Sequence, residues 1–190
     1  MTAHGARPPA QRPLRTQSDR DLARDFVHAL KAGDGLAGAH CIHERWMRGH
    51  FPSHIEKDLE LLWKHAGASI PDWLPMRYIS WLSTAYDVAQ TFSAKGSGRS
   101  NIYLILLDYS DRRGDAHGVY VGMSRYPPAQ RFDQHKAGIR AAGSVLKRGI
   151  EVLTGPTLHL QHIKRGEAAR IEMALAGALA DAGIRVEGGH

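Results

Sequence analysis

The chain contains very little cysteine and asparagine: Cys41 and Asn101 are the only residues of their types among 190. One thiol cannot form a disulfide within the chain, and it cannot supply the several thiolates of a cysteine-based zinc cluster. The sequence therefore excludes a disulfide framework and a cysteine zinc cluster as sources of stability.

Long hydrophobic runs are also missing. No apolar stretch approaches the roughly 20 residues that a helix needs to cross a bilayer. The first residues carry arginine and proline rather than the apolar core of a signal peptide. With 43% hydrophobic and 23% charged residues, the composition is that of a globular chain. The sequence predicts a cytoplasmic protein with no membrane partner.

Positive charge exceeds negative charge. The chain has 25 Lys and Arg against 19 Asp and Glu, which gives +6 at pH 7, and its 12 histidines can add to this charge as the pH falls. A basic surface favours polyanions through counterion release and steering, although many basic proteins bind nothing specific. We expect a nucleic-acid partner, with DNA as the first choice.

The first half of the chain is predicted to be helical. Residues 1–17 combine proline with arginine and predict a disordered basic tail. Apolar residues at helical spacing in 18–92 predict three or four helices, the first of them capped by Ser18. Residues 93–100 are rich in serine and glycine and predict a flexible linker to a second domain at 101–190.

Histidines gather in the helical region around the single cysteine. The group consists of His40, Cys41, His43, His50 and His54. A zinc site is one interpretation, but the spacing matches no common ligand pattern. We favour the other interpretation, in which these side chains lie on exposed helix faces.

The second domain has the pattern of an α+β fold. Two runs of β-branched and aromatic residues, 101–109 and 118–122, each carry one tyrosine and predict a hairpin with a long loop. Apolar spacing predicts three helices, at about 128–137, 139–148 and 166–182. It also predicts one more strand, at 157–163. The prediction is a small three-stranded antiparallel sheet flanked by helices, preceded by an all-helical N-terminal region.

Three side chains of this domain suit phosphate chemistry. Arg131 and His135 lie four residues apart after two prolines, so one helix face presents a guanidinium and an imidazole. Arginine matches a phosphate by bidentate donation, and histidine can move a proton near neutral pH. Glu172 lies at the edge of a helix's buried face, where a single carboxylate is a suitable ligand for Mg²⁺.

Tyr103 and Tyr120 lie on the two strands of the predicted hairpin. To act as a base at pH 7, a phenol needs its pKa lowered from near 10 to near 7, which costs about 4 kcal/mol. A metal, Arg131 or His135 could contribute to that change. Without such help the tyrosines would orient water or phosphate by hydrogen bonds, or simply pack as most strand tyrosines do.

The order of these residues resembles the GIY-YIG nuclease superfamily over about residues 101–183. The matching positions are Tyr103, Tyr120, Gly122, Arg131, His135 and Glu172. The chain departs from the family pattern at Asn101, where the family has glycine, and in a longer loop between the two tyrosines.

The resemblance implies single-metal hydrolysis of phosphodiester bonds in DNA. A tyrosine-assisted water would attack, Arg131 would hold the phosphate, and Glu172 would bind Mg²⁺ or Mn²⁺. Between residues 131 and 170 there are eight Lys and Arg against three acids, which favours a phosphate-binding surface. The substrate-binding candidates are Gly122, Ser124, Lys136, Arg140, Lys147 and Arg148.

Other interpretations stay open. A nucleic-acid-binding protein that keeps the fold without turnover fits the same residues, and so does a toxin or effector nuclease with the same chemistry. No recognition helix is visible that would decide the strandedness of the substrate. The N-terminal helices would supply DNA binding, target choice or dimerisation, so a homodimer is left open.

Overall fold

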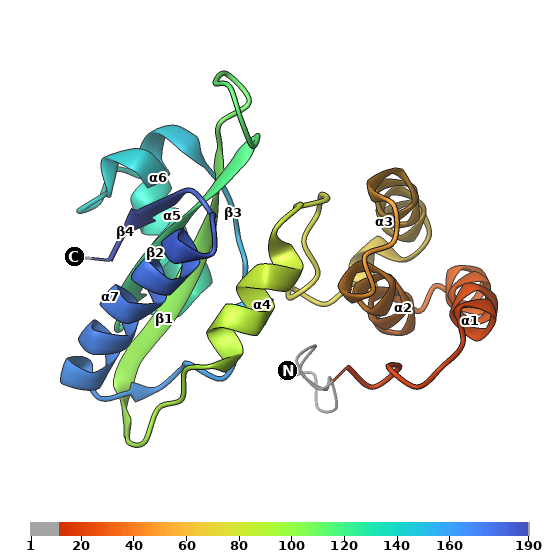
Figure 1. The fold of residues 1–190 in the computed structure, drawn as a ribbon, viewed down its shortest axis with the longest axis horizontal. Coiled ribbons are helices and arrows are strands. Elements are labelled where there is room, and N and C mark those ends of the chain that lie inside the picture. The colour runs from red at the N-terminus through yellow and green to blue at the C-terminus, as the bar shows by residue number, and fades with distance from the viewer. Residues whose placement is uncertain (1–11, 190) are drawn as a thin grey trace. The chain divides into compact units, whose positions relative to one another are not determined.

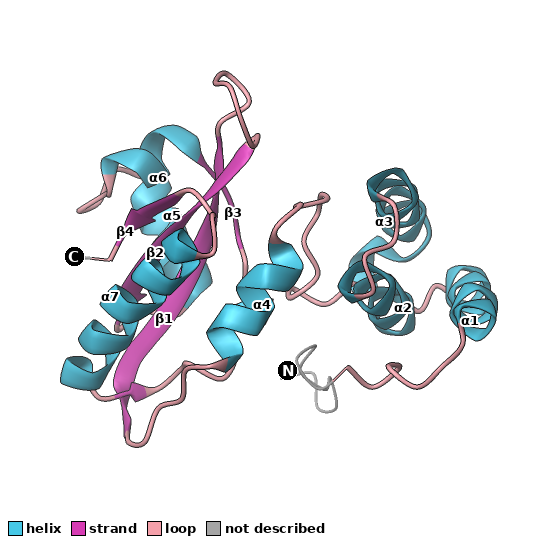
Figure 2. Ribbon diagram, viewed as in Figure 1, coloured by secondary structure: helices cyan, strands magenta, loops and turns pink. Residues whose placement is uncertain are grey.

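The computed structural model describes residues 12–189 (Figure 1). The described residues form two compact units, one within Met1–Ser83 and the other within Thr84–His190. The first unit is helical and the second holds the sheet (Figure 2). The fold is therefore α+β with a helical N-terminal region, as the sequence predicts.

Three helices build the first unit. They are α1 at Asp19–Ala32, α2 at Gly35–Met47 and α3 at Pro52–Ala66, followed by a short 3₁₀ turn, η2, at Gly67–Ser69. Ser18 caps α1 by accepting a hydrogen bond from the Asp21 N–H, and Gly33 ends the helix at a φ of 64°. The apolar helix faces meet in a core that includes Leu22, Phe26, Ile42, Ile55 and Leu62.

Residues 12–17 have a defined structure, which corrects part of the predicted disordered tail; residues 1–11 lie outside the described residues. Arg12 pairs with the buried carboxylate of Glu44 at 2.7 Å. Arg48 pairs with the same carboxylate at 2.8 Å and donates to backbone carbonyls of the 12–17 segment. The sequence gives no local sign of this arrangement, because the partners are 32 positions apart.

A four-stranded mixed sheet is the centre of the second unit. Its order is β3-β1-β2-β4, with β1 at Ser97–Asp108, β2 at His117–Ser124, β3 at Gly149–Val152 and β4 at Val186–Gly188. β1 and β2 form the predicted antiparallel hairpin, β3 pairs antiparallel with β1, and β4 pairs parallel with β2. The accompanying helices are α4 at Leu82–Gln90, α5 at Pro128–Lys136, α6 at Gly143–Arg148 and α7 at Arg165–Asp181.

The predicted three-stranded antiparallel sheet is thus wrong in its strand number and in one strand position. Segment 157–163 is not a strand; it follows a 3₁₀ turn, η3, at Gly155–Thr157, and its Ile163 makes isolated bridges to the start of β1. His162 adopts a φ of 57°, which breaks the alternation, so that Leu160 and Ile163 are both buried. β3 and β4 have four and three residues, too few to show a periodicity.

The segment expected as a linker, 93–100, runs into the sheet, because Ser97–Ser100 belong to β1. The Gly98 N–H donates to the His162 carbonyl at 2.7 Å, and a Cβ on Gly98 would lie 2.3 Å from the Ile163 carbonyl oxygen. Glycine here permits a close approach of two backbone segments, so this part of the composition does not mark flexibility.

β1 is the most buried strand of the sheet. Its residues from Ile102 to Leu107 have almost no exposed surface. α7 contacts both β1 and β2, and α5 and α6 contact β1 and β3. The central strand is therefore covered by helices, which explains its continuous apolar run. None of the helices in residues 12–189 is both long enough and apolar enough to cross a membrane.

Candidate active site

The β1–β2 hairpin brings the two tyrosines together. Tyr103 is paired with Gly122 and Tyr120 with Ile105, so both tyrosines lie on the same face of the sheet. Their ring centroids are 6.1 Å apart. A Cβ at Gly122 would lie 2.5 Å from the Tyr103 hydroxyl oxygen and 2.7 Å from Cε1 of Tyr120, so only glycine leaves room for both rings.

His135, on α5, contacts Tyr103 in the protein interior. The histidine is 1% exposed, and its Nε2 lies 3.1 Å from the Tyr103 hydroxyl oxygen. Its Nδ1 accepts a hydrogen bond from the Ala142 backbone N–H at 3.0 Å. Because an N–H can only donate, Nδ1 carries no proton, and we assign the proton of the neutral imidazole to Nε2. His135 therefore donates to Tyr103 and fixes the orientation of its hydroxyl.

The charge state of His135 agrees with this assignment. Burial, and then the positive charge of Arg131, lower the pKa of His135 to about 4. The imidazole is neutral at pH 7, with both ring nitrogens engaged. In this state it positions Tyr103 and does not take a proton from it.

Both tyrosines hold their protons at neutral pH. Burial raises the pKa of Tyr103 well above its ordinary value, and Tyr120 and Glu172 add to the rise against the opposing effect of Arg131. Burial and then Glu172 also raise the pKa of Tyr120, although a hydrogen bond with Tyr103 and the charge of Arg131 act the other way. The phenols are therefore hydrogen-bonding groups unless further positive charge enters the site.

Arg131 is held by the loop that follows α5. Its guanidinium donates to the side-chain oxygen of Gln134 at 3.1 Å and to the carbonyls of Ile139 and Arg140 at 3.2 and 2.8 Å. Arg140 adopts a φ of 45°, in the left-handed region that side-chain-bearing residues rarely occupy. Arg131 also acts to lower the pKa of Tyr103, against the larger effect of burial. The guanidinium is thus fixed by this loop.

Glu172 reaches the same site from α7. It is 8% exposed, and its negative charge raises the pKa of both Tyr103 and Tyr120. An effect on both phenols places the carboxylate within electrostatic reach of each of them. The structure therefore brings the five predicted catalytic residues into one group: Tyr103, Tyr120, Arg131, His135 and Glu172.

A hollow of about 610 Å³ opens beside Arg131. Within the described part of the chain its lining holds no carboxylate but four arginines: Arg125, Arg131, Arg140 and Arg165. The Arg125 guanidinium lies 5.0 Å from the Tyr126 ring centroid and donates to the Tyr126 hydroxyl at 2.9 Å. Ser124, a predicted substrate-binding residue, also lines the hollow. Four guanidinium groups around one space suit phosphate groups in charge and in hydrogen-bonding geometry.

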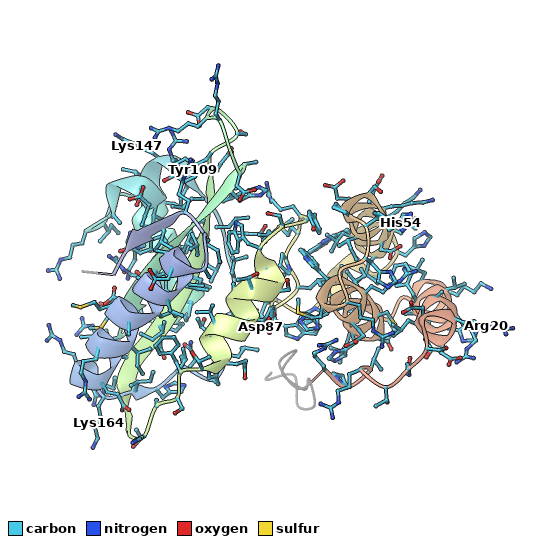
Figure 3. The ribbon with its side chains drawn as sticks, in the orientation of Figure 1. Arg20, His54, Asp87, Tyr109, Lys147 and Lys164 are labelled. Atoms are coloured by element: carbon cyan, nitrogen blue, oxygen red, sulfur yellow. The ribbon has the colours of Figure 1, made fainter. Side chains whose placement is uncertain are left out.

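Four predicted substrate-binding residues do not line this hollow: Gly122, which lies against the two tyrosine rings, and the cations Lys136, Lys147 and Arg148. The Lys136 ammonium donates to two backbone carbonyls at the end of α6 and just after it. Arg148 pairs with Asp111 at 2.7 Å and lies 4.5 Å from the Tyr109 ring centroid. Lys147 lines a separate small hollow with Arg148 and Asp111, and Figure 3 shows Lys147 and Tyr109 close together at one end of the sheet. Two of these cations are engaged in holding the protein's own loops.

Other residues of the hollow do not stand out in the sequence. Arg125 and Tyr126 directly follow Ser124, so their position just after the second tyrosine strand is a signal that could have found them. Arg165 is the first residue of α7, far along the chain, and nothing in its local sequence connects it with Arg131. The fold alone brings Arg165 to this place.

Glu172 would supply one carboxylate ligand to a divalent metal at this site. Mg²⁺ takes one or two carboxylates, keeps several waters and accepts phosphate oxygens. Glu172 offers one carboxylate near the tyrosines. Residues 12–189 contain no group of three or more His, Cys, Asp or Glu side chains that could hold a metal ion. A metal at Glu172 would therefore take most of its ligands from water and substrate.

The interpretation that the residues around Cys41 lie on exposed helix faces is wrong for Cys41 and His43, which are buried, and two of the histidines pack against an aromatic ring. His40 and His43 lie 5.0 and 5.8 Å from the Trp73 ring, measured between centroids. Burial lowers the pKa of His43 to about 4 and raises the pKa of the Cys41 thiol to about 12. The thiolate is the form that binds metals, so a thiol with this pKa is a poor ligand at neutral pH.

Comparisons with protein-family models, with curated proteins and with solved structures give no match for this chain.

Proposed function

We propose that the second unit is a divalent-metal-dependent endonuclease that hydrolyses phosphodiester bonds in DNA. The observation that carries the proposal is the convergence of two tyrosines, an arginine, a histidine and a glutamate beside an arginine-lined hollow. These five side chains come from the consecutive elements β1, β2 and α5 and from α7, farther along the chain. Their order along the chain is also that of the GIY-YIG nucleases, which the sequence resembles.

Each side chain has a role that follows from its contacts. Arg131, pre-positioned by three hydrogen bonds, would bind the non-bridging oxygens of the scissile phosphate. Tyr103, oriented by His135, and Tyr120 would position the attacking water. The water oxygen forms a new bond to phosphorus and gives up a proton to solvent, while the bond from phosphorus to the leaving oxygen breaks and that oxygen takes a proton from solvent. Mg²⁺ or Mn²⁺ at Glu172 would neutralise charge on the phosphate and help expel the leaving oxygen.

A second candidate is a nucleic-acid-binding protein without turnover. One observation favours it: burial raises the pKa of both Tyr103 and Tyr120, and a protonated phenol cannot accept a proton from water. In this candidate the arginine-lined hollow holds the nucleic acid and no bond is cut. The nuclease requires the positive charge of a metal to offset the effect of burial.

Measuring binding and cleavage on the same variants separates the two candidates. Glu172→Ala should abolish Mg²⁺-dependent cleavage and retain DNA binding, because the arginines of the hollow remain. Arg131→Ala should weaken both activities, because this side chain lines the hollow and lies beside the tyrosines. Cleavage by the Glu172→Ala variant at the wild-type rate would contradict the proposed role of the carboxylate.

A further inference from the structure

Two sets can be distinguished among the cations of the second unit. One set is engaged within the protein: Lys136 donates to backbone carbonyls, and Arg148 pairs with Asp111. The other set lines two hollows. Four arginines line the hollow described above, and Lys95, Lys164 and Arg170 line a second hollow of about 700 Å³. The second set is therefore directed toward spaces that a ligand can enter.

The two hollows are neighbours at the start of α7. Lys164 and Gly166 line the second hollow, and Arg165, between them in the sequence, lines the first. Consecutive Cα atoms are about 3.8 Å apart. The two hollows therefore lie close to one another on either side of residues 164–166, within the reach of one polymer chain.

The second hollow is basic because, among the residues that the structure describes, three cations outnumber the one carboxylate in its lining. Within the described residues Glu167 is the one acid in its lining, and this side chain accepts a hydrogen bond from the Lys95 backbone N–H at 2.8 Å. The Lys164 side chain lies along Gly96, where an added Cβ would be 2.9 Å from the lysine Cε. Glu167 thus holds the backbone at Lys95, while the cationic side chains of Lys95, Lys164 and Arg170 line the hollow.

We propose that the two hollows form one continuous track for the sugar-phosphate backbone of a nucleic acid, running from Arg131 past Arg165 to Lys95, Lys164 and Arg170. The inference rests on the proposed function and assigns the second hollow to phosphates that flank the scissile one. A single phosphate or a mononucleotide would occupy one hollow, whereas a polymer spans both. Binding therefore tightens with substrate length until both hollows are filled.

The test is the salt dependence of binding by the full chain, measured in EDTA so that cleavage does not interfere. Fluorescence anisotropy would follow labelled DNA of about 4 and about 16 nucleotides, single-stranded and duplex. Each phosphate contact contributes about 0.7 to the slope of log association constant against log salt concentration for single strands, and about 0.9 for duplex. The double variant Lys164→Ala/Arg170→Ala removes two contacts. With the longer DNA its slope should therefore be shallower by about 1.4 for single strands or about 1.8 for duplex. The shortest DNA should bind the variant as it binds the wild type. The single variant Lys95→Ala should reduce the slope by about half as much as the double variant does.

Arg112→Ala/Arg113→Ala is the matched control. It removes the same charge from the exposed β1–β2 loop next to Tyr109, and Figure 3 shows Tyr109 and Lys164 at opposite ends of the sheet. The control should keep the wild-type slope, and all variants should keep the wild-type unfolding temperature. An unchanged slope in the track variants, or an equal loss in the control, overturns the inference.

The same measurements separate this inference from the proposed function. A wild-type chain that binds along the track but cuts no substrate contradicts the nuclease and supports the track. A chain that cuts DNA but whose track variants keep the full slope contradicts the track alone. Absence of DNA binding by the wild type overturns both.

Discussion

The Nε2 atom of His135 lies 3.1 Å from the hydroxyl oxygen of Tyr103, while the Nδ1 atom accepts a hydrogen bond from the Ala142 N–H. The backbone thereby determines which ring nitrogen carries the proton, and the histidine in turn orients the tyrosine. The Tyr103 ring lies beside the Tyr120 ring, with 6.1 Å between the centroids. One backbone N–H thus fixes the histidine that orients the first tyrosine beside the second.

We predict that His135 stays neutral, with its proton on Nε2, as the pH falls from 8 to about 5, because its pKa is lowered to about 4. NMR of ¹⁵N-labelled histidine side chains measures the tautomer and the titration together. The Tyr103→Phe variant should keep this tautomer, since the Ala142 N–H still determines it. A His135 that titrates near 6.5, or that carries its proton on Nδ1, would contradict the assignment.

Gly122 should be irreplaceable for steric reasons. In Gly122→Ala the new Cβ would lie 2.5 Å from the Tyr103 hydroxyl oxygen, so both tyrosine rings have to move. We expect a loss of about 1–3 kcal/mol in the free energy of unfolding, together with loss of cleavage. Urea unfolding followed by the near-UV circular dichroism of the tyrosines would measure the stability change.

The control for this substitution is Gly177→Ala. Gly177 lies within α7, is exposed, and would have no atom within 4 Å of an added Cβ beyond its own helix backbone. Alanine at this position should stabilise the helix by about 0.5–1 kcal/mol. Equal losses from the two substitutions would show that the close approach at Gly122 is not the cause.

The strands that carry the tyrosines, and their neighbouring helices, could be predicted because their sequence patterns are local. The apolar run of β1 and the prolines before α5 each appear within one short segment. β4 could not be found in this way, because its three residues gain their strand conformation by pairing with β2 at Val119–Val121. The same holds for Arg165, which joins the arginine-lined hollow only through the packing of α7.

The sequence alone also does not show which of the charged residues line the hollow. Counting Lys and Arg along the sequence predicts a basic surface, but it gives every cation equal weight. The structure separates Arg140, which lines the hollow, from Lys136 and Arg148, which are engaged with the protein itself. This difference depends on carbonyl and carboxylate partners from other elements, and the order of residues does not reveal them.

In the first unit, the stability should depend on the Glu44 carboxylate. Burial would raise its pKa, but the hydrogen bonds from Arg12 and Arg48 outweigh burial and lower it. Because the folded-state pKa lies below the unfolded value, this contribution is fully present above about pH 4.5 and is lost as the pH falls through the folded-state pKa. Glu44→Ala should cost about 1–3 kcal/mol at pH 7, and less in acid.

Tryptophan fluorescence during urea unfolding measures this effect in the first unit alone. All four tryptophans, Trp46, Trp63, Trp73 and Trp81, belong to that unit. Glu60→Ala, at an exposed position of α3, is a control that removes one carboxylate without removing a buried ion pair. If both variants lose stability equally at pH 7, the pairing of Glu44 with two arginines does not explain its contribution.

The central claim is metal-dependent cleavage at the site formed by Tyr103, Tyr120, Arg131, His135 and Glu172. The most direct measurement incubates the full chain with single-stranded, duplex and branched DNA, with Mg²⁺, with Mn²⁺ and with EDTA, and sequences the products at the cut. The account predicts cleavage of at least one DNA with either metal, none in EDTA, and a loss of at least about a hundredfold in the near-isosteric Glu172→Gln variant. No cleavage of any substrate by the wild type, or undiminished cleavage by Glu172→Gln, would contradict the account.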